Sequence, residues 1–365
     1  MQQNSLKLKQ LLLLTALAGA FASPAMAQTN VTISGLVDNY VGTMRNSGDT
    51  ASRRVVNSGG LTTSWIGFKG TEDLGGGLKA KFALTSFLQT DTGAQGRFPG
   101  DTLFSRDANV GLSGSFGGIS IGRDLAPHFL PTILFNPFGD SYVFSPLILH
   151  ADVPLFNRTG WTGSSAGDTG WSNEIIYSTP NFGGLTANIH YQFGEVPGDS
   201  GKRNVGANAL YFNGPLALTA FYHKVKVNNP LSAPVGNVQP AGNIPLPSKQ
   251  FATSQNAWMV GGSYDLTAAK LFATYGQTSH DIDLDDKTYS VGASVPLGSG
   301  RILASWADTR RSGAAVGANL KRDTVSIGYD HDLSKRTDLY AIVMNDKITS
   351  QSSANSIGLG VRHRF

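Results

Sequence analysis

The sequence predicts an all-β fold, a transmembrane antiparallel β-barrel of about sixteen strands. Three observations lead to this prediction. The N-terminus has the pattern of a secretory signal, the rest of the chain divides into segments of roughly ten residues with alternating polar and apolar side chains, and the last segment ends on the aromatic Phe365. Because each unpaired backbone N–H or C=O is costly in a bilayer, one membrane strand implies a closed ring of strands.

The first 27 residues are expected to form a cleaved signal peptide. Two lysines precede the apolar run at 11–18, and Ala25-Met26-Ala27 has the small-x-small pattern of a cleavage site. The mature chain, residues 28–365, is then expected to be a single barrel domain. No later stretch reaches the roughly 20 apolar residues that a membrane-spanning helix needs. The sequence has no cysteine, so neither disulfides nor a thiolate metal site can hold a loop-rich secreted fold.

The predicted strands follow one another with short and long connections in alternation, which is typical of a barrel with short turns on one rim and long loops on the other. Turns such as Asp73-Leu74-Gly75-Gly76 are rich in residues that favour tight reversals. We expect strands near 31–45, 60–71, 77–90, 102–115, 117–124, 171–180, 184–194, 203–213, 215–227, 255–265, 268–279, 286–296, 300–310, 321–332, 336–346 and 354–365.

The alternation within each strand separates two faces. In the last predicted strands, Val325 and Ile327 alternate with Thr324 and Ser326. An apolar face toward lipid and a polar face toward a water-filled lumen explain this pattern.

The longest connection, residues 125–170, is unusually apolar for a loop. It contains Phe129, Phe135, Phe138, Tyr142, Phe144 and Trp161 among many aliphatic residues. A long segment with so many large side chains is expected to pack against a surface, and the barrel interior is the surface available.

Several stretches of the chain resemble the general porins of Gram-negative bacteria, in particular the trimeric β-proteobacterial and neisserial type. The most specific is the block from Gly67 to Ala80, GFKGTEDLGGGLKA, and further matches are VTISGLVD at 31–38, ANVGLSGSFG at 108–117, YSTPNFGG at 177–184, DLSKRTDLYA at 332–341 and GVRHRF at 360–365. The resemblance covers the whole mature chain.

The resemblance implies sixteen strands, a homotrimer in the outer membrane among lipid and lipopolysaccharide, and a third long loop, 125–170, folded inward to form the constriction. It also implies that Phe365 belongs to the signal recognised by the barrel-assembly machinery. The chain departs from the family pattern at three positions expected to face the lumen: Trp65 replaces a basic residue, Thr85 a Glu, and Ile176 a Lys or Arg. These residues indicate either a less charged pore with its own substrate preference or packing beneath the inward loop.

Fixed charges on the wall and on the loop are expected to set ion selectivity, because a narrow throat of low dielectric constant focuses their field. Basic residues outnumber acidic ones among those expected at the lumen, which favours a weak preference for anions. We predict that the lumen or constriction is lined by Asp38, Trp65, Lys69, Lys81, Thr85, Arg106, Arg123, Asp140, Asp152, Arg158 and Ile176, with Lys79, Arg362 and Arg364 nearer the short-turn rim.

The function predicted from these observations is that of an outer-membrane porin, a water-filled channel for passive diffusion of small hydrophilic solutes and ions. No catalytic group and no cofactor are expected. The seven histidines are scattered, with no i, i+4 pair on a helix, so no metal site is predicted, and the small excess of basic residues does not suggest nucleic acid as a partner.

Three alternatives stay open at this point. One is a channel with a saturable site for sugars or aromatic acids, in which Trp65, Phe135, Phe138, Tyr142 and Trp161 supply the contact surface. The others are an outer-membrane barrel enzyme, for which no catalytic triad can be assembled from the strand pattern, and a surface adhesin that works through its long loops.

Overall fold

The computed structural model describes residues 30–98, 100–151, 168–201, 203–226, 254–281, 283–314 and 319–365. The predicted signal peptide and the predicted lumen residues Asp152 and Arg158 lie outside these ranges. Within them, no helix is long and apolar enough to cross a membrane.

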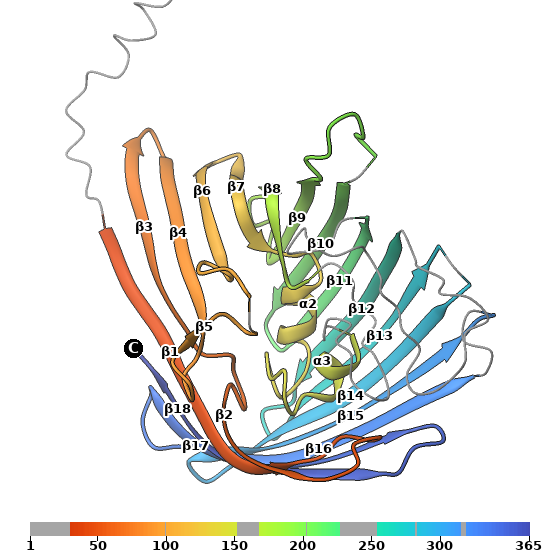
Figure 1. Ribbon diagram of the computed structural model, residues 1–365. Helices are drawn as coiled ribbons and strands as arrows, with labels where there is room; N and C mark the ends of the chain where they lie inside the picture. Colours follow the sequence, from red (N-terminus) through yellow and green to blue (C-terminus); the bar gives the residue numbers. More distant parts are fainter. Residues whose placement is uncertain are drawn as a thin grey trace, which may run out of the picture.

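A closed antiparallel ring of sixteen strands forms the molecule, as predicted (Figure 1). Each strand pairs with the next strand of the ring, and β1 closes the ring by pairing with β18 on one side and β3 on the other. The ring strands are β1 (Asn30–Met44), β3 (Trp65–Gly75), β4 (Leu78–Gln89), β6 (Asp107–Gly114), β7 (Gly117–Leu125), β8 (Gly170–Ser178), β9 (Leu185–Phe193), β10 (Arg203–Asn213), β11 (Leu216–Val225), β12 (Gln255–Asp265), β13 (Lys270–His280), β14 (Asp285–Leu297), β15 (Gly300–Ser312), β16 (Leu320–Asp332), β17 (Thr337–Ile348) and β18 (Ala354–Arg364).

Two shorter strands, β2 (Arg53–Ser58) and β5 (Ala94–Gln95), lie in the connections that precede β3 and β6. The strand predicted at 60–71 begins later, at Trp65. The backbone N–H groups of residues 60–62 donate hydrogen bonds to the buried Asp38 side chain of β1 instead of joining the sheet. The strand predicted at 102–115 likewise begins only at Asp107.

The two faces of the strands are inverted relative to a soluble protein. On β16, Thr324 and Ser326 are fully buried inside the ring, whereas Val325 and Ile327 are exposed. The same alternation continues through β17 and β18. An exposed apolar band around a polar interior is the pattern of a barrel whose outer surface meets lipid.

The connection between β7 and β8 contains two short helices, α2 (Phe129–Leu134) and α3 (Pro146–Ala151), which lie inside the ring (Figure 1). Helix α2 contacts β10 and β11, and α3 contacts β14, β15 and β16. We call the first described part of this connection, residues 126–151, the inner loop.

Apolar contacts hold the inner loop to the wall. Phe144 is completely buried and meets the Tyr40 ring edge-on, with ring centroids 5.6 Å apart. Around them, the buried cluster also includes Leu61, Phe138, Leu149, Leu303, Ile342 and Met344. The four phenylalanines of the inner loop, Phe129, Phe135, Phe138 and Phe144, are therefore buried inside the barrel, as the hydrophobic effect favours.

Hydrogen bonds from the wall to the backbone of the inner loop accompany this apolar packing. Ser326 donates a hydrogen bond to the Phe144 carbonyl over 2.6 Å, and Arg322 donates one to the Leu149 carbonyl over 3.1 Å. Both donors project inward from β16. The backbone carbonyls of a loop inside the ring thus find partners on the wall, which a buried segment must do to be stable.

Candidate channel lumen

A basic strip lies on the inner face of β3 and β4. Lys69 projects from β3 with about half of its side chain exposed, and Lys79 and Lys81 are exposed on β4. The only acid in an ion pair with these lysines, among the described residues, is Asp107, whose carboxylate is 3.5 Å from Lys69 Nζ. Lys79 and Lys81 line a pocket together with a second carboxylate, Asp124. This carboxylate accepts hydrogen bonds from Asn109 and Ser120.

Arg106 extends the strip toward the inner loop. Its guanidinium carbon is 4.3 Å from the centre of the Trp65 ring, and its Nη1 is 3.1 Å from Asp107 Oδ2. Stacking on an aromatic face fixes an arginine without neutralising it, because the ring contributes only a quadrupole. Trp65, at a position where the family resemblance implies a basic residue, therefore serves as a platform for a neighbouring cation.

Thr85 and Ile176 are buried. Thr85 is fully buried and donates a hydrogen bond to Asp107 over 2.7 Å, so it orients the acid of the basic strip. Ile176 is buried on the inner side of β8.

A second charged group forms where the chain returns from the inner loop to β8. Asp168 accepts two hydrogen bonds from Arg97, at 2.6 and 3.0 Å, and one from Arg123 at 3.2 Å. Burial alone would raise the pKa of Asp168, but the two guanidinium groups outweigh it and hold the pKa below its ordinary value. Arg123 also donates to the Ser105 carbonyl over 2.7 Å, so this predicted lumen residue is fixed by structural contacts.

Asp38 is completely buried and organises the segment 59–64. Its carboxylate accepts hydrogen bonds from the backbone N–H groups of Gly60, Leu61 and Thr62 at 3.1, 2.9 and 2.8 Å, and from the Tyr340 hydroxyl. A carboxylate so fully engaged acts as the anchor of a backbone turn.

Asp140 lies in the inner loop between α2 and α3 and meets the same segment. Burial raises the pKa of Asp140, while a hydrogen bond with Thr62 and the charge of Arg362 act in the opposite direction. A neighbouring hydroxyl, Ser141 Oγ, donates to the Gly60 carbonyl over 2.6 Å. The inner loop is therefore joined to the segment 59–64 by polar contacts as well as by apolar ones.

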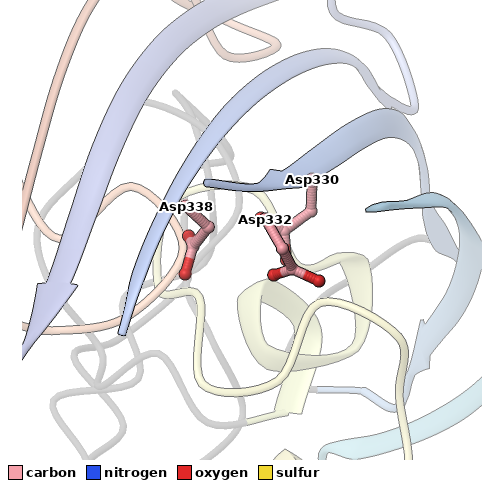
Figure 2. A group of neighbouring side chains, drawn as sticks. All are labelled: Asp330, Asp332 and Asp338. Atoms are coloured by element: carbon pink, nitrogen blue, oxygen red, sulfur yellow. The ribbon is translucent and has the colours of Figure 1, made fainter. Parts of the chain in front are cut away.

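Three acids gather on the inner face of β16 and β17. Oxygen atoms of Asp330, Asp332 and Asp338 lie within 4.8 Å of one another (Figure 2). Each acid is already paired with arginine: Arg301 binds Asp330 and Asp332, Arg362 binds Asp330 and Asp338, and Arg364 binds Asp338. With as many arginines as acids, the group is an ion-pair ladder across β15 to β18 and offers little net attraction to a cation.

The predicted lumen residues thus divide into two sets. Lys69, Lys81, Arg106 and Trp65 lie along the basic strip, whereas Asp38, Thr85, Arg123, Asp140 and Ile176 are committed to internal contacts. Their assignment as pore-lining residues stays a prediction. Sequence reasoning missed Arg97 and Asp168, because their partners are far away in the chain and no local motif marks them.

A closed ring of strands with an apolar outside, a charged inside and a loop packed within it defines a transmembrane β-barrel channel. Comparison with known proteins gives the family. The model of the Gram-negative porin family matches residues 14–351. The chain belongs to this family, and it forms an outer-membrane channel for passive diffusion of small hydrophilic solutes.

Individual relatives agree with this assignment. The chain is 34% identical to outer membrane porin protein 32 of Delftia acidovorans, over 96% of this chain and 92% of that one. It is 28% identical to an outer membrane porin protein of Bordetella pertussis, over 98% and 100% of the two chains. Among solved structures, the anion-selective porin from Comamonas acidovorans superposes with a TM-score of 0.71 at 27% identity, covering 93% of this chain and all of that one.

Proposed function

We propose that this porin conducts anions in preference to cations, and that the basic strip on β3 and β4 is the cause. The observation that carries the proposal is the charge balance of that strip. Four cations, Lys69, Lys79, Lys81 and Arg106, share the region with three carboxylates, Asp107, Asp124 and Asp73, the last of which faces Lys79 across the strand pair at the turn. The similarity to a solved porin that is described as anion-selective supports the proposal.

Three interior acids on other parts of the wall and the inner connection add little to this field, because each is already paired. Asp38 and Asp168 are buried and satisfied by hydrogen bonds, and Asp338 is bound by two arginines. A compact ion pair has a weak field at a distance, whereas an exposed lysine acts over about a Debye length, roughly 8 Å at physiological salt. The net potential felt by a permeating ion is therefore dominated by the strip.

The inner loop is proposed to form the constriction. It contacts the wall from β10 through β17 and on to β1, so the remaining opening is bounded by the loop on one side and by the wall that carries the strip on the other. Proximity to a low-dielectric loop would strengthen the field of the strip.

The assembly is proposed to be a homotrimer, as the resemblance to trimeric porins implies, with the signal peptide removed during export. Lipopolysaccharide is the expected neighbour at the outer rim, and recognition by the barrel-assembly machinery is expected to involve Phe365.

A saturable site for aromatic solutes is less well supported. Phe135 and Phe138 are almost completely buried against the wall, so they cannot offer contact surface to a solute. Of the other three residues in the proposed aromatic set, Trp65 is half-buried beneath Arg106, Tyr142 of the inner loop is half-buried, and Trp161 lies outside the described residues.

The test is the reversal potential of the purified protein in a planar bilayer under a KCl gradient. The proposal expects insertion in three-part conductance steps and a potential with the sign of anion preference, larger at low salt. A potential of the opposite sign, or none at any ionic strength, would overturn the selectivity, and single-step insertion would overturn the trimer.

A further inference from the structure

Three histidines that are distant in the sequence meet inside the barrel. His128 lies in the inner loop just before α2, His190 is on β9 and His223 is on β11. Their exposed fractions are 1%, 4% and 1%. None of them belongs to the basic strip, and the proposed selectivity makes no use of them.

The register of the sheet explains why they meet. Gly206 of β10 pairs with His190 on one side and with His223 on the other, so the two histidines stand at the same height on strands separated by one strand. Because Gly206 has no side chain, Pro127 of the inner loop can occupy the space between them. A Cβ atom at that position would lie 2.6 Å from Pro127 Cγ, so the glycine also lets the inner loop approach the wall and bring His128 over the pair.

Five of the six imidazole nitrogens of this group lack a partner among the described residues. Both ring nitrogens of His128 and of His223, and Nε2 of His190, are buried with no hydrogen-bond partner among the described residues. The hydroxyl of Thr274 is also buried without a hydrogen-bond partner among these residues. A cavity of about 30 Å³ is lined by His128, His223 and Thr274, which is room for a small polar occupant. Buried polar atoms are rarely left without a partner, so this group requires an explanation.

Glu174 of β8 prepares one of the histidines for binding. Its Oε1 is 2.7 Å from His190 Nδ1, which leaves Nε2 of the same ring as the nitrogen available to a ligand. A carboxylate that holds one nitrogen of a histidine while the other binds a metal is a common arrangement in metalloproteins.

The separation of the other two rings suits a shared ion. The His128 and His223 centroids are 5.1 Å apart with an interplanar angle of 86°. Two imidazoles that bind one tetrahedral Zn²⁺ at about 2.0–2.1 Å have centroids roughly 5 Å apart. The Trp171 ring, with its centroid 6.0 Å from that of His223 and 6.2 Å from that of His190, packs beside both wall histidines.

We propose that His128, His190 and His223 form a binding site for a divalent transition-metal ion, of the class of Zn²⁺, Ni²⁺ or Cu²⁺. Imidazole nitrogen is a preferred ligand of these ions, and oxygen-preferring ions such as Ca²⁺ and Mg²⁺ would bind poorly. Within the described residues, only the Asp330 group already has its ligand atoms within 4.8 Å of one another, so binding at the histidines requires side-chain rotation. The cavity beside His128 and His223 gives those two rings room to rotate.

The bound ion would fasten the inner loop to the wall. His128 directly precedes helix α2 of the inner loop, whereas His190 and His223 are part of the ring, so a shared ion links the loop to two strands of the barrel. The site is independent of the basic strip, and metal binding can fail while anion preference holds, or the reverse.

The experiment uses the full-length mature protein without a histidine tag, stripped with EDTA and titrated with Zn²⁺ by calorimetry. The proposal expects one ion per chain, at least tenfold weaker binding after His128→Gln or His223→Gln, and unchanged binding after His363→Gln on the exposed rim. Replacing Zn²⁺ with Co²⁺ should give the visible absorption of a tetrahedral nitrogen-ligated ion.

Two results would overturn the proposal. One is the absence of stoichiometric binding to the folded protein, which would assign the cavity to water. The other is binding that survives both substitutions or depends on His363, which would assign the metal to an adventitious surface site. Folding of each variant is checked by heat-dependent migration on a denaturing gel. If the wall variant His223→Gln fails to fold, the loop variant His128→Gln decides the question.

Discussion

The Tyr340 hydroxyl on β17 donates a hydrogen bond to Asp38 on β1, across the intervening strand β18. Gly360 of β18 makes this possible, because a side chain there would collide with the Tyr340 ring. The same carboxylate holds the backbone of Leu61 and Thr62. One buried acid thus joins the closure of the barrel to the segment that meets the inner loop.

Replacing Asp38 should therefore destabilise the barrel. We expect Asp38→Ala to lower the free energy of unfolding by about 3 kcal/mol, since it leaves several buried donors without an acceptor. Asp38→Asn keeps one acceptor oxygen and should cost less. Urea unfolding followed by tryptophan fluorescence measures both. Asp199→Ala, at an exposed loop, is the control, and equal stability of Asp38→Ala and this control would contradict the anchoring role.

The basic strip makes a separate prediction about conduction. The double variant Lys69→Glu and Lys81→Glu should move the reversal potential toward cation preference, because it reverses two exposed positive charges of the strip while leaving the inner loop in place. The effect should shrink as salt rises, since counterions screen exposed charges. Lys347→Glu reverses a charge on the outer face of β17, and a comparable shift in that control would show that the strip does not set selectivity.

The stability of the protein should depend on pH through His150 of α3. Its ring nitrogens lie 2.8 Å from the hydroxyls of Thr309 and Thr324. Burial lowers the pKa of His150 well below 6.5, the nearby Arg322 lowers it further, and Asp346 opposes them only in part. A folded-state pKa below the unfolded value means that the unfolded chain takes up the proton first, so stability falls as pH decreases below about 6.5.

The pH profile of unfolding between pH 7.5 and 5 tests this sign. His150→Gln can still make one donated and one accepted bond but does not titrate, so the slope should decrease by up to one proton, about 1.4 kcal/mol per pH unit. Other buried histidines keep part of the slope. His363→Gln, at an exposed ring, should leave the profile unchanged, and a wild-type slope in His150→Gln would exclude the proposed cause.

The sequence predicted the ring well because lipid and water impose a strict period of two on every strand. The alternation of Val325 and Ile327 with Thr324 and Ser326 reports the two faces directly. The strand predicted from residue 60 failed at its start, since nothing local indicates that Asp38 draws residues 60–62 inward. Pattern alone cannot predict a bend whose cause lies on another strand.

The interior contacts were less predictable, because they too join residues that are far apart in the sequence. Asp168 meets Arg97 and Arg123, which are 71 and 45 residues away, and the histidine group combines positions 128, 190 and 223. The alternation predicted that Lys69 and Lys81 face inward, but it could not distinguish an exposed lysine from a buried, paired arginine such as Arg123. That distinction depends on where the inner loop lies.

The last prediction concerns the seam where the two ends of the ring meet. Gly35 and Phe365 exchange backbone hydrogen bonds of 3.0 and 3.1 Å, and the Phe365 ring lies directly on Gly35. A Cβ atom at residue 35 would be 2.5 Å from Phe365 Cζ and 2.7 Å from the Trp65 carbonyl. Gly35→Val should therefore prevent the Phe365 side chain from packing on residue 35, and it should reduce the yield of folded barrel.

Two assays separate packing from recognition at this seam. Gly35→Val should fold poorly both in cells and in detergent micelles, because its defect is steric. Phe365→Ala removes the expected assembly signal and should reduce the yield in cells more than refolding in micelles. Gly118→Ala is the control, since a Cβ there makes only ordinary contacts of 3.5 and 3.6 Å. Equal losses for Phe365→Ala in both assays would reduce its role to packing against Gly35.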